Sequence, residues 1–279
     1  MKQREILVTN DDGFAAPGIN IIAELLREYG NVTVVAPKYP QSGKSAAITL
    51  DKPLEIDLIR EEPAAAAVAT GSDGSAGQPE KGSLKVYSLT GTPVDCAKLG
   101  INIYIHKGTM PDLLISGVNH GSNASAASIY SGTLGAATEG TIYGVPSIGL
   151  SIDTHRQDVD FGPLVHYSRI LLDKYFENGF IPGVFLNVNF PVLPLEQIKG
   201  FKVAHQGHGR WVREFDHRVS PRGRHYFWMV GEFEDHEEGV PGCTGDHALI
   251  KEGWISIVPH KVDTTDYEEA ERLKKIWDL

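Results

Sequence analysis

Short apolar runs alternate along the chain with segments of helical periodicity. The first apolar run, residues 6–8, is followed by a helical pattern over 19–29 and by a second apolar run over 32–36. The pattern predicts an amphipathic helix over 158–179 and further strands at 85–89, 113–115, 146–152 and 184–190. A strand, a helix and a strand in this order predict a right-handed βαβ unit. The chain is therefore expected to form an α/β fold with a mainly parallel sheet.

Residues near the ends of two predicted helices indicate where these helices begin and end. Pro17 suits the first turn of the first helix, and Gly30 is the expected C-terminal cap. Thr92 is the expected N-cap of the second helix, with Pro93 in its first turn. Asp95 would complete a capping box with Thr92.

The domain organisation follows from changes in pattern along the 279 residues. We expect one α/β domain over 1–279, because a chain of this length can bury one large core. Residues 60–82 are low in complexity and predict a surface insertion. Extended, aromatic and charged segments predict a β-hairpin over 201–235, and residues 254–279 are expected to form a C-terminal strand and helix. Exposed aromatic β structure of this kind is typical of a contact between subunits.

Composition narrows the classes of partner and location. The net charge of −10 argues against a non-specific binder of nucleic acid polymers or of anionic membranes. Cys96 and Cys243 lie far apart without a CxxC motif, so both are expected to pack as small apolar residues in a reducing compartment. Because no stretch matches a signal peptide or a membrane span, we expect a cytoplasmic protein. The 11 histidines form neither HExxH nor a helix-spaced pair before a third ligand, which argues against zinc-hydrolase chemistry.

Two adjacent carboxylates, Asp11 and Asp12, follow the first predicted strand. Adjacent side chains converge only where the chain leaves extended geometry, and Gly13 permits that departure through a positive φ. Two like charges held together favour a hard divalent cation with oxygen ligands. A polar turn that caps the next helix is the alternative. In open parallel sheets ligands bind at the carboxyl ends of strands, which is where the pattern places this pair.

The loop after the second strand offers hydroxyl groups at the same edge. Its sequence GKS at 43–45 is similar to the end of a P-loop, but Lys38 stands where that motif needs a glycine. We therefore reject a P-loop. Ser42 or Ser45 could supply an oxygen ligand, and a plain turn is the alternative for each of them.

A third loop follows the strand at 113–115 and contains two asparagines. Asn119 offers a carbonyl oxygen to a cation, and Asn123 could donate its amide to an anion. Ser131, Gly132 and Thr133 then lead into a helix of small residues, whose free N–H groups would form an anion site. A simple N-cap followed by a closely packed helix is compatible with that interpretation.

The strand over 184–190 carries two further asparagines, Asn187 and Asn189, between apolar residues. Side chains two residues apart in a strand point to the same side, so both are expected on one polar face. The pattern assigns them no ligand.

Taken together, these motifs resemble the SurE family, the stationary-phase survival proteins that act as metal-dependent 5′-nucleotidases. The resemblance rests on four ordered motifs, which are NDDG at 10–13, SG at 42–43, SGVNHGSN at 116–123 and SGT at 131–133. It covers the chain except for residues 60–82. It implies a Rossmann-like three-layer α/β/α core with a protruding β-hairpin and a C-terminal oligomerisation segment.

The resemblance also implies a site and a cofactor. One divalent cation per subunit, Mg²⁺ or Mn²⁺, is expected on the positions that match the family's metal ligands, Asp11, Asp12, Ser42 and Asn119. The resemblance therefore favours Ser42 over Ser45 as the serine ligand of the cation. Phosphate contacts are expected from Asn123, Ser131, Gly132 and Thr133. The catalytic residues would be Asp11 and Asp12. This chain has Thr244-Gly-Asp246 where the family usually has Gly-Thr-Asp, so the resemblance carries no role to Thr244.

The activity that the resemblance implies is hydrolysis of nucleoside 5′-monophosphates by metal-assisted attack of water, in a homodimer or homotetramer. A covalent aspartyl-phosphate phosphatase is a second possibility, although that chemistry commonly uses two aspartates separated by one residue. A non-catalytic nucleotide-binding or phosphate-binding regulatory module is a third. A phosphatase that acts mainly on 3′-nucleotides or polyphosphate is a fourth.

Overall fold

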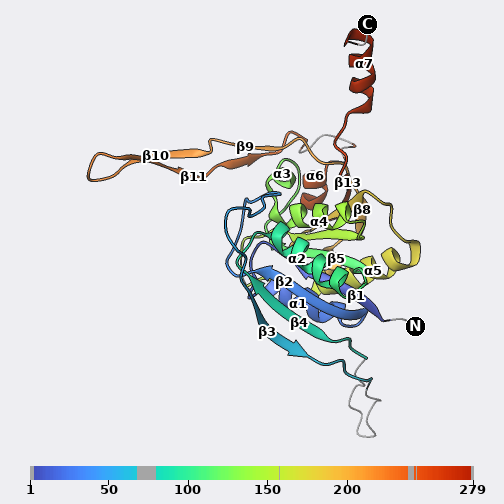
Figure 1. Ribbon diagram of the computed structural model, residues 1–279. Helices are drawn as coiled ribbons and strands as arrows, with labels where there is room; N and C mark the ends of the chain where they lie inside the picture. Colours follow the sequence, from blue (N-terminus) through green and yellow to red (C-terminus); the bar gives the residue numbers. More distant parts are fainter. Residues whose placement is uncertain (1–2, 68–79, 157, 238–241, 243, 278–279) are drawn as a thin grey trace.

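A nine-stranded sheet runs through the body of the protein (Figure 1). The computed structural model describes residues 3–67, 80–156, 158–237, 242 and 244–277. Within these residues the strand order is β3-β4-β2-β1-β5-β6-β7-β13-β8. The strands are β1 (Arg4–Thr9), β2 (Gly30–Pro37), β3 (Ile56–Glu62), β4 (Leu84–Leu89), β5 (Leu113–His120), β6 (Ser147–Ile152), β7 (Val184–Phe190), β8 (Phe201–Val203) and β13 (Ile255–Lys261).

Most of the sheet is parallel. The neighbouring strands from β4 through β2, β1, β5 and β6 to β7 all pair in parallel. At one edge β3 is antiparallel to β4, and towards the other edge β13 is antiparallel to β7 and parallel to β8. The predicted α/β fold with a mainly parallel sheet is confirmed.

Helices cover both faces of this sheet, because successive side chains of each strand point to opposite faces. Ile6 and Val8 of β1 belong to a core shared with α1 (Pro17–Leu26) and α5 (Gly162–Asn178). Leu7 belongs to a second core with α2 (Pro93–His106) and α4 (Gly132–Ile142). Strands buried on both faces are apolar at consecutive positions, which explains the uninterrupted apolar runs. No helix that the structure describes is long and apolar enough to cross a membrane.

The second core also contains one of the two cysteines. Cys96 is fully buried among the residues of α2 and packs there as a small apolar side chain, as expected. Cys243 lies outside the described residues.

The predicted capping box of α2 and the position of Pro17 in the first turn of α1 are confirmed, whereas the predicted C-cap of α1 is wrong. Thr92 accepts a hydrogen bond from the backbone of Asp95, whose carboxylate accepts one from the backbone of Thr92, so the capping box is present. By contrast, α1 ends at Leu26 with Arg27 as its C-cap, and Gly30 is the first residue of β2. A Cβ atom at Gly30 would lie 2.2 Å from the carbonyl oxygen of Arg4, so close packing of strands requires this glycine.

The predicted insertion over 60–82 begins too early. Residues 60–62 belong to the edge strand β3, where Arg60 forms ion pairs with Glu24 and Glu62. The polar sequence of this strand end suits an edge that faces solvent. A bridge between Ala65 and Lys81 brings the two ends of the remaining segment together. Residues 68–79 lie outside the described residues.

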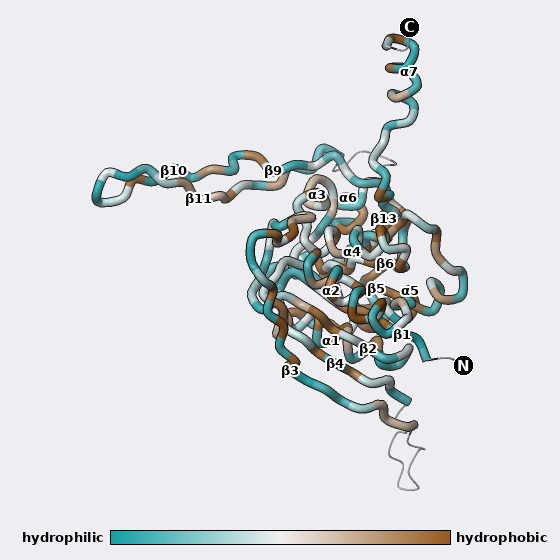
Figure 2. The backbone as a smooth tube through the Cα atoms, viewed as in Figure 1, coloured by the Kyte–Doolittle hydropathy of each residue, from teal (hydrophilic) through white to brown (hydrophobic). Residues whose placement is uncertain are grey.

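A long β-hairpin and the C-terminal helix project from the body (Figure 1). The hairpin contains β9 (Arg210–Val212), β10 (Phe215–Val219), β11 (His225–Met229) and β12 (Glu232–Glu234), paired as β9 with β12 and β10 with β11. The predicted hairpin over 201–235 begins too early, because residues 201–203 form β8, which pairs with β13 in the central sheet. Hydrophobic positions recur along this arm (Figure 2). The projecting helix is α7 (Tyr267–Trp277), and the remaining helical segments are α3 (Ala127–Tyr130), a 3-10 turn at Leu195–Gln197 and α6 (Asp246–Lys251).

The capping box of α2 leads to a stability prediction. Replacing Thr92 with alanine removes the side-chain acceptor for the first turn, together with a hydrogen bond from its hydroxyl to the carbonyl of Ala47. We expect Thr92→Ala to lower the free energy of unfolding by about 1 kcal/mol, measured by urea denaturation. The exposed Thr264 provides a control, and Thr264→Ala should leave the unfolding midpoint unchanged. An equal effect of both substitutions would contradict the capping role.

Candidate metal and phosphate site

The predicted site lies at the point where the order of strands reverses. From β1 the chain passes through α1 to β2 on one side, whereas β5 pairs with β1 on the other side. In open α/β sheets the crevice at the carboxyl ends of two such strands is the usual binding site for ligands. Asp11 and Asp12 follow β1 directly, and Asn119 lies near the end of β5.

The turn that carries the two carboxylates is held by Asn10. This buried side chain accepts a hydrogen bond from the N–H of Gly13 at 3.2 Å and donates one to the carbonyl of Gly13 at 3.0 Å. Gly13 has a φ of +96°, as its predicted role in leaving the strand requires. Asn10 therefore fixes the turn from which Asp11 and Asp12 project, a role that the sequence pattern did not assign to it.

Asp11 is packed against the first turn of α4. Its side chain is almost fully buried, and its Oδ1 accepts a hydrogen bond of 2.6 Å from the hydroxyl of Thr133. A Cβ atom at Gly132 would lie 3.1 Å from the Cβ and 3.3 Å from the Oδ2 of Asp11, so the close approach suits a glycine. Ser131 is the N-cap of α4 and accepts a hydrogen bond from the N–H of Leu134. The carboxylate and the positive end of a helix are therefore in contact.

Burial changes the acidity of Asp11. Removal from water, with a smaller contribution from the neighbouring charge of Asp12, raises the pKa of Asp11 from 3.8 to about 6. Hydrogen bonds from Thr133 favour the ionised form and oppose this shift. The surroundings compensate the charge of this carboxylate only in part. A bound cation would therefore stabilise it strongly, because a positive charge nearby favours the ionised form.

Asp12 is oriented by a residue of β5. Its Oδ2 accepts a hydrogen bond of 3.0 Å from the backbone N–H of His120, and the ring Nδ1 of His120 lies 3.4 Å from the same oxygen. The ring of His120 is buried and packs edge-on against Phe161, whereas the side chain of Asp12 is 20% exposed. His120 is a site residue that the sequence reasoning missed, since its only signal is its position next to Asn119.

The two candidate serines have different surroundings. The N–H of Gln41 donates to the backbone carbonyl of Asp11 at 2.7 Å, which brings the following residue, the exposed Ser42, next to the carboxylate turn. The hydroxyl of Ser45 instead donates to the carbonyl of Ile129 at 2.7 Å, which ties Ser45 to α3. The position of Ser42 is consistent with the choice of this serine over Ser45.

Two predicted loop asparagines are held in defined orientations. The amide of Asn119 donates to the carbonyl of Gly121 at 2.7 Å, so its Oδ1 is turned away from that carbonyl. The amide of Asn123 donates to the hydroxyl of Ser151 at 2.8 Å, and the whole residue is buried. No hydrogen bond that the structure gives for the described residues joins Asn123 directly to the two carboxylates.

A pair of buried asparagines on β7 fixes the backbone of Asn123. Its N–H donates to Asn189 at 2.8 Å, and its carbonyl accepts a hydrogen bond from Asn187 at 2.9 Å. The amide of Asn189 also donates to the side-chain oxygen of Asn187. The expected shared face of these two residues is correct, but both are completely buried and hold a loop of the site. In the sequence, the only sign that these two asparagines act together was their alternation with apolar residues.

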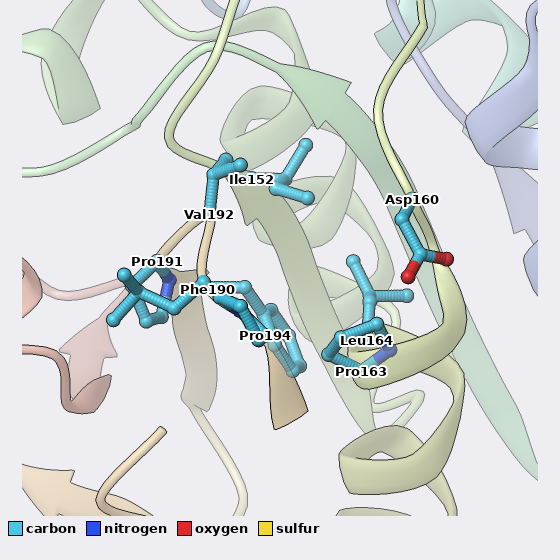
Figure 3. A pocket seen from close by; sticks show the side chains of 9 residues that line it. Ile152, Asp160, Pro163, Leu164, Phe190, Pro191, Val192 and Pro194 are labelled. Carbon is cyan, nitrogen blue, oxygen red and sulfur yellow. The ribbon is translucent and has the colours of Figure 1, made fainter. Parts of the chain in front are cut away.

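A separate pocket lies at the carboxyl ends of β6 and β7 (Figure 3). It has a volume of about 260 Å³, with Asp160, Pro163 and Leu164 on one side and the segment from Phe190 to Pro194 on the other. Its lining is mainly apolar and includes none of the predicted site residues. The pocket therefore does not coincide with the cluster around Asp11 and Asp12.

The family is decided by comparison with known proteins. Residues 6–213 match the family model described as survival protein SurE. The chain belongs to the SurE family. Among curated SurE proteins, it is 39% identical to one from Christiangramia forsetii, over 100% of this chain and 98% of that protein. It is also 39% identical to one from Flavobacterium psychrophilum, over 100% of this chain and 99% of that protein. Both relatives bear the name 5′-nucleotidase SurE.

A solved structure of the SurE family has the same fold. The crystal structure of the SurE protein from Aquifex aeolicus superposes with a TM-score of 0.75 at 30% sequence identity. The match covers 98% of this chain and 99% of that chain. The resemblance to the SurE family seen in the sequence motifs is therefore confirmed along the whole chain.

The raised pKa of Asp11 predicts that this residue destabilises the cation-free protein. Well below pH 3.8 the carboxyl is protonated in both the folded and the unfolded chain, and its burial does not lower the stability. Between pH 3.8 and about 6 the carboxyl ionises in the unfolded chain but stays protonated in the folded chain, so the free energy of unfolding falls as the pH rises. Above about pH 6 this decrease reaches its full value of roughly 3 kcal/mol. We therefore expect Asp11→Asn to raise the free energy of unfolding at pH 8 by about 1–3 kcal/mol.

This difference should be measured by chemical denaturation with a chelator present, so that no cation binds the carboxylates. At pH 3.5 the advantage of Asp11→Asn should shrink to a few tenths of a kcal/mol at most, because wild-type Asp11 is then mostly neutral in both states. A variant that is less stable than the wild type at pH 8 would contradict the proposed desolvation of this carboxylate.

Proposed function

We propose that this protein is a metal-dependent phosphomonoesterase that hydrolyses nucleoside 5′-monophosphates to nucleoside and phosphate. The observation that carries the proposal is the contact between the buried carboxylate of Asp11 and the first turn of α4. Groups that attract a cation and groups that attract an anion meet there, as the hydrolysis of a phosphate ester requires. The name 5′-nucleotidase, which both full-length relatives bear, supports a nucleotide as the substrate.

The donor groups around Asp11 fit a hard divalent cation. Asp11, Asp12, Ser42 and Asn119 would hold Mg²⁺ or Mn²⁺ through carboxylate, hydroxyl and amide oxygens, the ligands that such ions prefer. The burial that raises the pKa of Asp11 is an independent sign of the fit, because a cation removes this penalty. When bound, the ion would polarise a phosphoryl oxygen and increase the acidity of a water molecule.

The start of α4 and Asn123 would bind the phosphoryl group. Ser131, Gly132 and Thr133 form the N-terminal turn of the helix, where backbone N–H groups and the helix dipole favour negative charge. The backbone N–H and carbonyl of Asn123 are held by Asn189 and Asn187, respectively. Donors held in place in this way stabilise charge on the transferred group without reorganisation during the reaction.

The two carboxylates have different tasks in this proposal. The oxygen of the attacking water forms a bond to phosphorus while the bond from phosphorus to the ester oxygen breaks. The water loses a proton, and the ester oxygen leaves with the bonding electron pair and takes up a proton from solvent to give the nucleoside. Asp12 is the better-placed acceptor of that proton, because its side chain is partly exposed and is oriented by the N–H of His120. Asp11, which is buried and bonded to Thr133, positions the cation.

Metal dependence and substrate class can be tested in one assay. Phosphate release from AMP, GMP, CMP and UMP is measured with chelator-treated protein, with and without added Mn²⁺ or Mg²⁺. We expect release only after a cation is added, and an Asp11→Asn variant should lose at least about 100-fold in kcat, because a ligand to the ion is lost. Release of phosphate without any cation, or from polyphosphate alone, would contradict the proposal. A folded protein that binds nucleotides without releasing phosphate would favour the regulatory-module alternative.

The two serines provide a matched pair for the same assay. Ser42→Ala should raise the concentration of cation needed for half-maximal activity, because it removes a ligand. Ser45→Ala should leave that concentration close to the wild-type value, because the hydroxyl of Ser45 is bonded to Ile129. The reverse order of effects would show that Ser45, and not Ser42, is the ligand.

We further propose that the protein acts as a homo-oligomer assembled through the hairpin. Phe215, Phe227, Trp228 and Met229 are all exposed on β10 and β11, where the arm stands away from the body (Figures 1 and 2). Several large apolar side chains on one projecting arm are typical of a surface that another subunit covers. The C-terminal helix α7 exposes a second group of apolar side chains, including Trp277.

The role of the hairpin can be tested by changing its charge. A Trp228→Glu variant should sediment at a lower mass than the wild type at equal protein concentration, because a charge is placed in an apolar contact. Arg222→Glu, at the exposed turn of the hairpin, changes charge without removing an apolar side chain and should keep the wild-type mass. If Trp228→Glu has the sedimentation coefficient of the wild type, the hairpin does not hold the oligomer together.

A further inference from the structure

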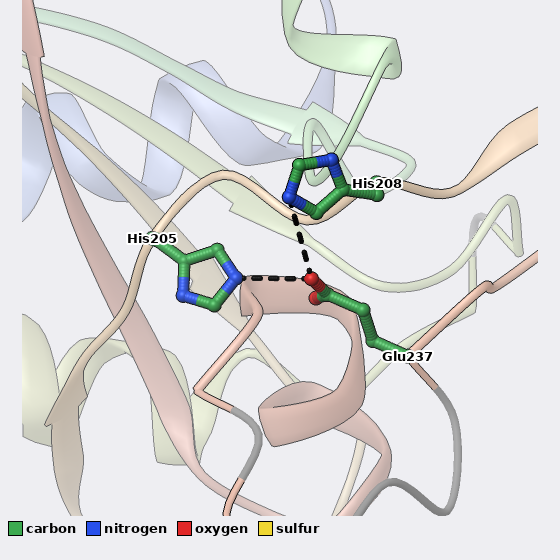
Figure 4. Close-up of side chains that lie close together, drawn as sticks. All are labelled: His205, His208 and Glu237. Atoms are coloured by element: carbon green, nitrogen blue, oxygen red, sulfur yellow. Dashed lines mark hydrogen bonds and ion pairs between the residues drawn. The ribbon is translucent and has the colours of Figure 1, made fainter.

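Two histidines and a glutamate meet at the root of the hairpin (Figure 4). His205 and His208 precede β9, whereas Glu237 follows β12, so the three side chains come from both legs of the hairpin. The Nε2 of His205 lies 3.1 Å from Oε1 of Glu237, and the Nε2 of His208 lies 3.6 Å from the same oxygen. The potential ligand atoms of all three residues are within 4.8 Å of one another.

These separations are close to those between ligands of one metal ion. Bonds of about 2.1 Å at a tetrahedral angle place two ligand atoms about 3.4 Å apart, and the two measured values lie on either side of this distance. The distance between the ligand nitrogens of His205 and His208 is at most 4.8 Å. It can shorten, because the side chain of His208 is 76% exposed and its ring can turn. Glu237, whose side chain is 15% exposed, forms the more rigid base of the cluster.

A neighbouring hydroxyl supports the orientation that a ligand histidine needs. The Nδ1 of His205 is hydrogen-bonded to the hydroxyl of Thr244 at 3.1 Å. A proton on Nδ1 that is donated to this hydroxyl leaves Nε2 with a lone pair directed at the other two ligands. Histidines that bind metals usually have such a partner on the second nitrogen, and the partner fixes the ring. This contact also gives a structural role to Thr244, to which the family resemblance assigned none.

We propose that His205, His208 and Glu237 bind one Zn²⁺ ion, or a divalent ion of similar softness, at the root of the hairpin. Two imidazoles and one carboxylate suit zinc, cobalt or nickel better than magnesium, which prefers oxygen ligands. The fourth position is open to water, because both imidazoles are on the surface. This site is distinct from the all-oxygen site around Asp11, and its three ligands come from both legs of the hairpin.

Such an ion would connect the legs of the hairpin to the phosphate-binding loop. Between the two histidines, the N–H of Gly207 donates to the buried carboxylate of Asp246 at 2.9 Å. The same carboxylate accepts a hydrogen bond from the N–H of Ser125 at 3.0 Å, two residues after Asn123. An ion held by His205 and His208 would therefore restrain a segment that is bonded, through Asp246, to the loop of the candidate active site.

The test measures zinc binding directly. The full-length protein is stripped with a chelator, supplied with excess Mg²⁺ to occupy the oxygen site, and titrated with Zn²⁺ by calorimetry. We expect one Zn²⁺ per chain. His208→Ala and Glu237→Gln should each weaken binding at least about 100-fold, and Thr244→Val should weaken it about tenfold through the orientation of His205. His236→Ala, an exposed histidine next to Glu237, is the matched control and should bind as the wild type does.

A second readout identifies the ligands. Co²⁺ in place of Zn²⁺ should give visible absorption bands that change in His208→Ala and persist in His236→Ala. Circular dichroism shows whether each variant is folded, and the exposed position of His208 makes this substitution the least disruptive one. The proposal is overturned if wild-type protein binds no Zn²⁺ in excess Mg²⁺. It is also overturned if His208→Ala and Glu237→Gln bind Zn²⁺ with wild-type affinity.

Discussion

The hydrogen bond between Thr133 and the buried Asp11 joins the two halves of the candidate active site. Asp11 follows β1, and Thr133 lies in the first turn of α4, so this contact joins the turn that we expect to bind a cation to the helix that we expect to bind an anion. A Cβ atom at Gly132 would lie only 3.1 Å from the Cβ of Asp11, so the absence of a side chain there favours this close contact. The cost is a desolvated carboxylate with a raised pKa, a strain that a bound cation would relieve.

Buried polar groups away from the carboxylates support this arrangement. Asn187 and Asn189 satisfy the backbone of Asn123, and Asp246 accepts hydrogen bonds from the backbone of Ser125 and Gly207. Burial raises the pKa of Asp246, while these backbone donors favour its ionised form. Polar groups that are fully satisfied inside a protein specify a single arrangement of the loops they hold. The loop of the candidate site is therefore positioned by β7 and α6, which lie late in the sequence.

The same network extends to the root of the hairpin. Gly207, which donates to Asp246, lies between His205 and His208, so the proposed zinc cluster and the loop that contains Asn123 share one buried anchor. The hairpin beyond this root carries the exposed aromatic side chains. One continuous set of contacts thus links the oligomerisation arm that we propose to the loop that we expect to bind phosphate.

The sequence by itself determined the fold class and the family, and it predicted the loops of the candidate site, because these depend on local pattern and motif order. Apolar runs, the NDDG turn and the capping box around Thr92 are visible within a few residues. Only the tertiary structure decided where the strands end and which residues hold the loops of the candidate site in place. Gly30 is required by contact with Arg4, residues 60–62 join an edge strand, and Asn187 reaches a loop that precedes it by 64 residues. His205, His208 and Glu237 have no regular spacing, so their convergence follows from how the two legs of the hairpin meet.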